Sequence, residues 1–239
     1  MPNATAAMLV IGDEILSGRT RDSNSHHLAQ ELTAAGIDLR EVRFVADDQA
    51  AIVEALNALR RAYDHVFTSG GIGPTHDDIT ADAVAAAFGV HIDVRADAAA
   101  LLGAHYEKTG RDFNEARKRM ARIPDTATLI ENPVSVAPGF TIGNVHVMAG
   151  VPNVFHAMLA GVLSGLAKGQ PLLSRSLRVE RGEGDIAGPF GALATEYPDL
   201  SMGSYPFVQD GVTGTNLVIR GTDAARLDEA MARLTDLTA

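Results

Sequence analysis

The chain of 239 residues contains no cysteine and no tryptophan, and only 5% of its residues are aromatic. Without cysteine, disulfide bonds, thiolate catalysis and zinc sites built on thiolates are excluded. Basic residues are outnumbered by acidic ones, 20 to 30, which gives a formal net charge of −10. This balance argues against binding to nucleic acid or to an anionic membrane, although a nucleotide needs only local neutralisation of its phosphates.

Long apolar runs are also missing. No stretch reaches the roughly 20 apolar residues that a membrane-spanning helix needs, so no membrane association is expected. Residues 1–5 carry no basic segment, and we therefore expect no secretory signal and a cytoplasmic location. With 46% hydrophobic residues, the chain is long enough for one ordinary domain and a small second one.

Short apolar runs alternate with amphipathic stretches in the first part of the chain. Ser23 or Asn24 is expected to cap the first connecting helix, which runs to Ala35 and stops at Gly36, and the second helix opens at Asp47 and Asp48. Alternation of this kind, with short connections, predicts an α/β fold with a doubly wound, mostly parallel sheet. The runs predicted as buried strands are residues 6–11, 39–45 and 66–68.

The rest of the chain divides at a linker, Gly169-Gln170-Pro171. Residues 1–169 are expected to form the first domain, which ends with a hairpin turned at Gly143-Asn144 and a helix at 154–168. Residues 172–239 predict a small α+β domain of βαββα order, with a turn at Asp210-Gly211 and a turn-like Gly203-Ser204-Tyr205-Pro206. We expect it to pack against the first domain or to mediate dimerisation.

A glycine-rich loop follows the third predicted strand. Glycine can adopt a positive φ and lets a ligand approach bare backbone. An alanine-rich helix begins directly after the loop, and we predict Thr80 as its N-cap. The free N–H groups of such a loop and the positive end of the helix form an anion site. We assign this site to Gly70, Gly71, Gly73, Pro74, Thr75 and Thr80.

This loop contains no lysine or arginine, so it matches neither G-x-x-x-x-G-K-[ST] nor G-x-G-x-x-G. The adjacent carboxylates of Asp77 and Asp78 would repel a phosphate unless a divalent metal ion bridged them to it. The simpler interpretation is that they stabilise a helix start. A predicted helix at 114–122 is basic; its cations are either solvated or supply the charge that the loop lacks. They are Arg117, Lys118, Arg119 and Arg122.

Polar residues also follow the first two strands. Asp13 and Glu14, preceded by Gly12, come after the first strand, and Asp47 comes after the second. Ligands of such sheets bind beyond the carboxyl ends of the strands, so we expect these residues to converge on the glycine loop. A weaker strand–glycine–helix junction occurs at Ala149-Gly150-Val151-Pro152.

Residues 70–80 resemble the signature of the MoaB/Mog molybdopterin-binding domains, in particular the CinA (competence/damage-inducible protein A) branch. The first motif of that branch is similar to residues 12–18 with Asp22 and Asn24. Ser135 and Ala149 depart from the family pattern. Full-length CinA proteins carry a C-terminal nicotinamide-nucleotide deamidase domain, and since this chain stops at residue 239 we expect that activity to be absent. Other similar motifs are Asn132-Pro133, Ala137-Pro138-Gly139-Phe140, Gly150-Val151-Pro152 and Gly203-Ser204-Tyr205-Pro206.

The resemblance implies two related chemistries. In the Mog branch the domain binds molybdopterin and adenylylates it with ATP and Mg²⁺. The resemblance implies that the residues at the positions of Asp47 and Asp78 carry out this reaction. In the CinA branch the domain is similar to a metal-dependent pyrophosphatase acting on ADP-ribose, and a similar domain accompanies some eukaryotic FAD synthetases. The motif match adds four ligand-binding positions: Gly12, Asn24, Gly150 and Pro152.

We therefore expect a metal-dependent hydrolase that cleaves a nucleoside-diphosphate linkage such as that of ADP-ribose, with Asp47 and Asp78 as catalytic residues. The alternative is a MoaB/Mog-type molybdopterin-binding protein that is non-catalytic or transfers adenylyl groups. The expected cofactor is Mg²⁺, Mn²⁺ or Co²⁺, and the expected partners are a small phosphorylated ligand (dinucleotide or pterin) and further copies of the chain. Which carboxylate is the general base stays open. The metal is assigned to Asp13, Glu14, Asp77 and Asp78.

Overall fold

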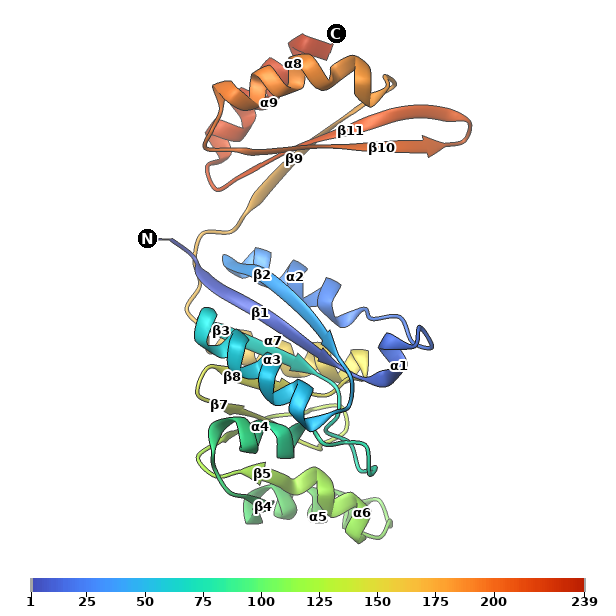
Figure 1. The fold of residues 1–239 in the computed structure, drawn as a ribbon, viewed down its shortest axis with the longest axis vertical. Helices are drawn as coiled ribbons and strands as arrows, with labels where there is room; N and C mark the ends of the chain where they lie inside the picture. The colour runs from blue at the N-terminus through green and yellow to red at the C-terminus, as the bar shows by residue number, and fades with distance from the viewer. Residues whose placement is uncertain (1, 239) are drawn as a thin grey trace. The chain divides into compact units, whose positions relative to one another are not determined.

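The computed structural model describes residues 2–238, which form two compact units that divide between Gly169 and Gln170 (Figure 1). Each unit has a hydrophobic core of its own. Among the helices of residues 2–238, every one is too short or too polar to cross a bilayer.

The first unit is built on a six-stranded sheet with the order β2-β1-β3-β8-β7-β6. The first four strands in this order run parallel, and β7 runs antiparallel to both of its neighbours, β8 and β6. The prediction of a mostly parallel, doubly wound sheet is therefore confirmed, and Gly143-Asn144 does join two antiparallel strands. The strands are β1 (Ala4–Ile11), β2 (Ile37–Val45), β3 (His65–Ser69), β6 (Thr128–Ile130), β7 (Gly139–Ile142) and β8 (Val145–Met148).

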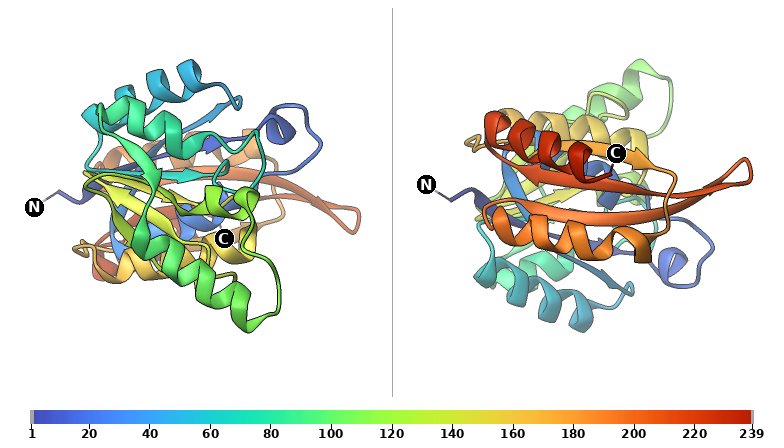
Figure 2. Two further views of the ribbon diagram at one scale, coloured as in Figure 1. Left: turned by 90° about the horizontal axis from the view of Figure 1, so that it is seen from below. Right: turned by 90° about the horizontal axis from the view of Figure 1, so that it is seen from above.

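Helices cover both faces of this sheet, and the views in Figure 2 show α3 and α4 on the opposite side from α7. Strand β1 explains the arrangement, because successive side chains of a strand point to opposite faces. Met8 and Val10 enter the core beneath α2 and α7, whereas Leu9 and Ile11 enter the core beneath α3, α4 and α5. The helices are α2 (Asn24–Ala35), α3 (Gln49–Ala62), α4 (Thr80–Phe88), α5 (Ala96–Lys108) and α7 (Pro152–Ser164).

Two predicted helix caps are corrected by the structure. The side chains of Ser23 and Asn24 do not cap α2; Asp22 accepts the N–H groups of Asn24 and Ser25 instead. Thr80 is the first residue of α4 and does not cap it, because its hydroxyl is used elsewhere. Gly36 ends α2 in the left-handed conformation, as predicted. A short helix, α1 (Asp13–Leu16), was not predicted.

The predicted basic helix at 114–122 is shorter in the structure. It consists of α6 (Glu115–Lys118) and a 3₁₀ turn, η1 (Arg119–Ala121), after which the chain becomes strand β5 (Arg122–Pro124). Strand β5 pairs with β4 (Ile92–Val94). A continuation of the helix into β5 is disfavoured, because Ile123 precedes Pro124 and a residue before proline avoids the helical conformation.

The second unit has the predicted βαββα order: β9 (Leu173–Val179), α8 (Glu183–Glu196), β10 (Ser201–Gln209), β11 (Val212–Gly221) and α9 (Ala224–Thr238). Asp210 and Gly211 both have positive φ in the β10–β11 turn, as a two-residue hairpin loop requires. The prediction that Gly203–Pro206 is turn-like is wrong, because these residues lie inside β10. β10 is an edge strand, where a proline without an N–H is tolerated.

Candidate functional site

A pocket of about 500 Å³ lies in the first unit, beyond the carboxyl ends of β1, β3 and β8. It is lined by the glycine loop after β3, by residues 149–152 and 154 after β8, and by residues of the 132–137 segment. This is the edge at which parallel sheets bind their ligands. Of the predicted site residues, the pocket is lined by Glu14, Gly70, Gly71, Gly73, Asp78, Gly150 and Pro152.

Two glycines of the loop have no room for a side chain. Gly70 has φ +108°, and a Cβ there would lie 2.1 Å from the carbonyl oxygen of Ile11. Gly71 has φ +68°, and a Cβ there would lie 2.1 Å from the Oγ1 atom of Thr80. Both positions therefore require glycine, and the loop is packed directly against the end of β1 and the start of α4.

Thr80 fastens this loop to α4. Its hydroxyl donates to the carbonyl oxygen of Gly70 at 2.9 Å, and its N–H donates to the carbonyl oxygen of Gly71 at 3.0 Å. The residue is fully buried. Within residues 2–238, the N–H groups of Gly71, Ile72 and Gly73 make no hydrogen bond. With its carbonyls engaged by Thr80, the loop leaves these N–H groups free for an anion.

Asp78 lies on the pocket wall with its carboxylate beside Gly73. Its Oδ2 atom accepts the N–H of Thr75 at 2.8 Å and the hydroxyl of Thr75 at 2.6 Å. Neither Pro74 nor Thr75 lines the pocket. In the structure Thr75 therefore orients Asp78, and direct contact of Pro74 and Thr75 with a ligand remains a prediction.

Acidic residues gather beside the loop, around Asp47. The N–H of Asp13 donates to Oδ2 of Asp47 at 2.9 Å, and the N–H of Asp47 approaches Oδ1 of Asp13 at 3.4 Å. Partial burial raises the pKa of Asp47, and the negative charges of Asp13, Glu14 and Asp77 raise it further, against the hydrogen bond from Asp13 that lowers it. Glu14 belongs to this cluster and also lines the pocket, as Asp78 does. The predicted carboxylates thus extend from Asp47 to the pocket wall.

The donor set of this cluster suits a hard divalent cation. Within residues 2–238, no three His, Asp or Glu side chains are already arranged as a metal site. Mg²⁺ does not need such a cage, because it is commonly held by one or two carboxylates, water and substrate phosphates. Asp13, Glu14 and Asp47 supply carboxylates beside an anion loop, so the residues fit the predicted metal without a preformed cage.

Asn24 connects three parts of the site. Its side-chain NH₂ donates to the hydroxyl of Ser69 and to the carbonyl oxygen of Gly150, both at 2.8 Å. Because a carbonyl oxygen can only accept, these contacts fix the orientation of the amide. The Oδ1 atom is buried and has no partner. Asn24 therefore holds the ends of β3 and β8 together, while its predicted contact with a ligand is untested. Gly12 does not line the pocket.

Asn132 has a structural role that its motif, Asn132-Pro133, did not predict. Its NH₂ donates to the carbonyl oxygen of Ala137 at 2.8 Å and to the hydroxyl of Ser135 at 2.6 Å. Its Oδ1 accepts the N–H groups of Val134 and Ser135. The asparagine thereby shapes the 132–137 loop, whose Asn132, Ser135 and Ala137 line the pocket.

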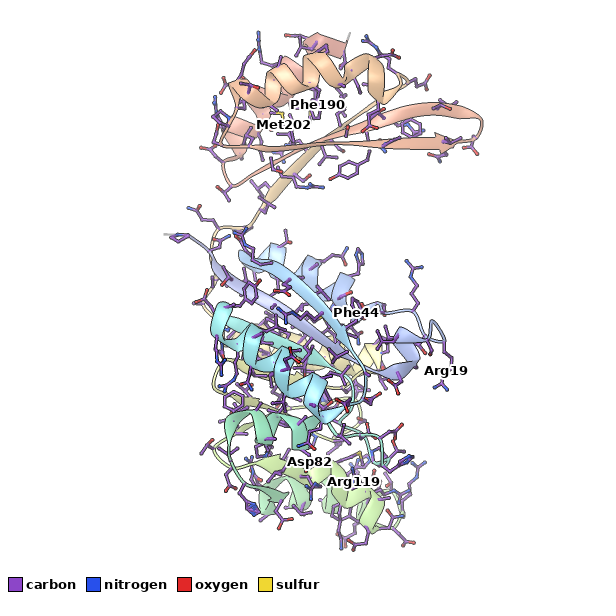
Figure 3. The ribbon with its side chains drawn as sticks, viewed as in Figure 1. Arg19, Phe44, Asp82, Arg119, Phe190 and Met202 are labelled. Atoms are coloured by element: carbon purple, nitrogen blue, oxygen red, sulfur yellow. The ribbon has the colours of Figure 1, made fainter. Side chains whose placement is uncertain are left out.

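Of the four basic residues at 117–122, only Arg119 contacts the glycine loop. Its Nε donates to the carbonyl oxygen of Thr75 at 3.1 Å, and its Nη2 donates to that of Asp78 at 3.2 Å. Figure 3 labels Arg119 beside Asp82 of α4, and both line a small cavity together with Gly71 and Gly73. The other three cations are engaged elsewhere: Arg117 on the Tyr106 ring, Lys118 with Glu115 and Arg122 with Asp82.

Both units of the chain match families of known proteins. Residues 7–172 match the family described as probable molybdopterin-binding domain, and residues 171–239 match the middle domain of FAD synthase. A protein of Caenorhabditis elegans named probable FAD synthase is 31% identical over 98% of this chain, which spans 50% of that relative. Relatives from Saccharolobus islandicus are 35% identical over 70% of this chain, which spans 66% of their length.

A solved structure agrees with the family match. The structure of CinA, of unknown function, from Thermoplasma acidophilum is 34% identical and superposes with a TM-score of 0.63, covering 69% of this chain and 98% of its own. The matches cover the sheet, the glycine loop and the pocket. This chain therefore belongs to the MoaB/Mog family of probable molybdopterin-binding domains, in its CinA-like form.

Proposed function

We propose that the first unit binds a phosphorylated pterin or a dinucleotide in the pocket beyond β1, β3 and β8. The observation that carries this proposal is the glycine loop, whose free N–H groups at residues 71–73 border a pocket of about 500 Å³. Backbone N–H groups of such a loop suit a diphosphate, and the remaining pocket has the volume of an ordinary small-ligand site. The family match supports a pterin, and the C. elegans relative, named probable FAD synthase, supports a nucleotide.

Thermal-shift measurements with ADP, ADP-ribose, FAD and a phosphorylated pterin, each with and without Mg²⁺, test this proposal. A ligand that binds only the native state stabilises it by RT ln(1 + [L]/Kd), so the unfolding temperature rises with ligand concentration. Binding should weaken in Val151→Glu, because Val151 is exposed at the pocket and a carboxylate there repels an anion. Val94→Glu adds the same charge to exposed strand β4 and serves as the control. No stabilisation by any of the probes would refute the proposal.

A second candidate function is hydrolysis of the diphosphate linkage. The observation that favours it is the carboxylate cluster around Asp47, together with Asp78 on the pocket wall. A divalent cation bound there would neutralise charge on the diphosphate. Asp47, whose pKa is raised, would hold a proton more readily than an ordinary carboxylate, and Asp13 would orient it through the 2.9 Å hydrogen bond. Hydrolysis adds water across one P–O bond, so ADP-ribose would yield AMP and ribose 5-phosphate.

Asp47→Asn removes the charge and keeps the shape of the side chain. We expect it to lose most of any turnover of ADP-ribose in Mg²⁺, Mn²⁺ or Co²⁺, and we expect Asp78→Ala to abolish it. Asp48→Asn is the matched control, because Asp48 only caps α3 and asparagine caps equally well. Undiminished release of AMP by Asp47→Asn would exclude it from the chemistry. If a nucleotide or pterin binds without turnover, the protein is either a binding protein or an adenylyl transferase. Incubation of the pterin with ATP and Mg²⁺ distinguishes the two, because only a transferase forms an adenylylated product.

A further inference from the structure

We propose that Arg119 is the positioning residue of the phosphate site and supplies the positive charge that its glycine loop lacks. The inference rests on the proposed function and names the residue that organises its anion site. Arg119 lies in η1, separated by 44 and 41 residues from the two carbonyl groups that it contacts. The contact is therefore made by the tertiary fold and not by local chain geometry.

The two hydrogen bonds of Arg119 fix the direction of two peptide groups. In a trans peptide the carbonyl and the N–H point in opposite directions. When Arg119 holds the carbonyl oxygen of Thr75, the N–H of His76 must point away from the guanidinium, and the N–H of Ile79 is set in the same way through Asp78. The clamp also fixes the backbone on both sides of the Thr75–Asp78 hydrogen bonds.

The guanidinium of Arg119 is bonded to carbonyl groups, while the carboxylates of Asp78 and Asp82 line the same small cavity. Within residues 2–238 it forms no ion pair, in contrast to Lys118 and Arg122 of the same segment. A guanidinium has five N–H donors, and Arg119 uses two of them on the loop. It shares with Gly71 and Gly73 the lining of a cavity of about 10 Å³, which is room for roughly one water molecule. Arg119 thus places a half-buried positive charge beside a glycine loop that contains no lysine.

The first experiment needs no ligand. Hydrogen exchange of the full chain is measured on peptides that cover residues 70–80 in wild type, Arg119→Ala, Arg119→Lys and Arg117→Ala. We expect faster exchange at Thr75, Asp78 and Thr80 in both Arg119 variants, because lysine cannot span two carbonyls with a planar fork. Arg117→Ala removes a neighbouring arginine that stacks on Tyr106 and should leave the loop unchanged. Unchanged exchange in Arg119→Ala would overturn the clamp.

The second experiment measures ADP affinity by calorimetry at several salt concentrations. Arg119→Ala should weaken binding by about tenfold or more and reduce its salt dependence, since one charge-assisted interaction is lost. Arg119→Lys keeps the charge and should lose less affinity than Arg119→Ala, although its loop exchanges as fast. Equal affinity in wild type and Arg119→Ala would overturn the charge role. If wild type fails to bind ADP and every other probe, the proposed function fails, and the exchange experiment still decides whether Arg119 holds the loop.

Discussion

At the scale of single residues, the site depends on polar side chains whose hydrogen-bond partners lie within the protein. Thr80 and Asn24 carry buried polar side chains near the pocket, and each bonds to another segment of the site. A polar group buried in this way is stabilising only when its partner is present, and removing one partner leaves the other unsatisfied. The free donors of the loop are therefore backbone N–H groups, and Thr80 and Asn24 hold the segments around them in place.

His146 of β8 shows a different consequence of burial. Only 4% of its surface is exposed, its Nδ1 lies 3.0 Å from the hydroxyl of Thr141, and its Nε2 lies 3.5 Å from Nδ1 of His65. Desolvation, with a smaller contribution from the charge of His65, lowers the pKa of His146 from 6.5 to about 4. The folded protein therefore keeps this imidazole neutral at a pH where the unfolded chain is protonated.

Stability should consequently fall on acidification. Above pH 6.5 the imidazole of His146 is neutral in both the folded and the unfolded protein, and its contribution to stability is fully present. Between pH 6.5 and about 4 the unfolded chain binds a proton at this imidazole and the folded protein does not, so stability is lost. The loss from this residue amounts to roughly 3 kcal/mol. Denaturant unfolding at pH 7.5 and 4.5 measures it, and His146→Gln should show a smaller loss. A variant with the same loss as wild type would show that His146 does not titrate in this way.

At the scale of helices and strands, the ends of the elements decide where the site residues lie. Asp47 and Asp48 are adjacent and both were predicted at the start of a helix, but they have different roles. Asp48 accepts the N–H of Ala51 at 2.8 Å and caps α3, whereas Asp47 faces Asp13 at the end of β1. One residue belongs to the helix and its neighbour to the carboxylate cluster.

The cap gives a prediction for α3. Asp48→Ala should destabilise the protein by about 1 kcal/mol, because it removes the acceptor of one N–H in the first turn. Asp48→Asn should be nearly neutral, since asparagine is an equally good cap. Denaturant midpoints compare the three proteins. An Asp48→Ala protein as stable as wild type would mean that water replaces the cap without loss.

At the scale of the whole molecule, the chain has separate cores. Leu217 and Ile219 of β11 are fully buried against α8 and α9, in a cluster that contains only residues of the second unit. The first unit has two clusters, one on each face of its sheet. A unit of about 70 residues is only marginally stable by its own core.

Leu217→Ala should therefore act within the second unit. The lost contacts and the resulting cavity cost about 2–5 kcal/mol, enough to unfold a marginal unit. Hydrogen exchange should rise across β9–α9 and stay low in β1 and β3, and ligand-induced stabilisation of the first unit should persist. Met8→Ala, in the first unit, is the reciprocal control. Exchange that rises equally in both units would show that the two unfold as one. Homo-oligomerisation stays a prediction, which light scattering of the full chain would test.

The predictions that held depend on local signals. Apolar runs, the left-handed Gly36, the Gly143-Asn144 turn and the Asp210-Gly211 turn are each determined by a few consecutive residues. The glycine loop and its acidic neighbours were recognised for the same reason. Two predictions that failed, the N-cap role of Thr80 and the turn-like residues 203–206, depended on partners outside their own segment: Gly70 for Thr80, and β11 for the strand. The Ser23/Asn24 cap and the full helix at 114–122 also failed.

The sequence by itself therefore determined the fold class and the position of the glycine loop, because hydrophobic periodicity, glycine and proline act locally, and its motifs indicated the family. Only the tertiary structure decided which polar residues meet. It brought Asp47 to Asp13, engaged Asn24 and Thr80 in holding the site together, and selected Arg119 from four basic residues. The physical reason is that hydrogen bonds between different helices, strands and loops depend on how these elements pack, which no local pattern records.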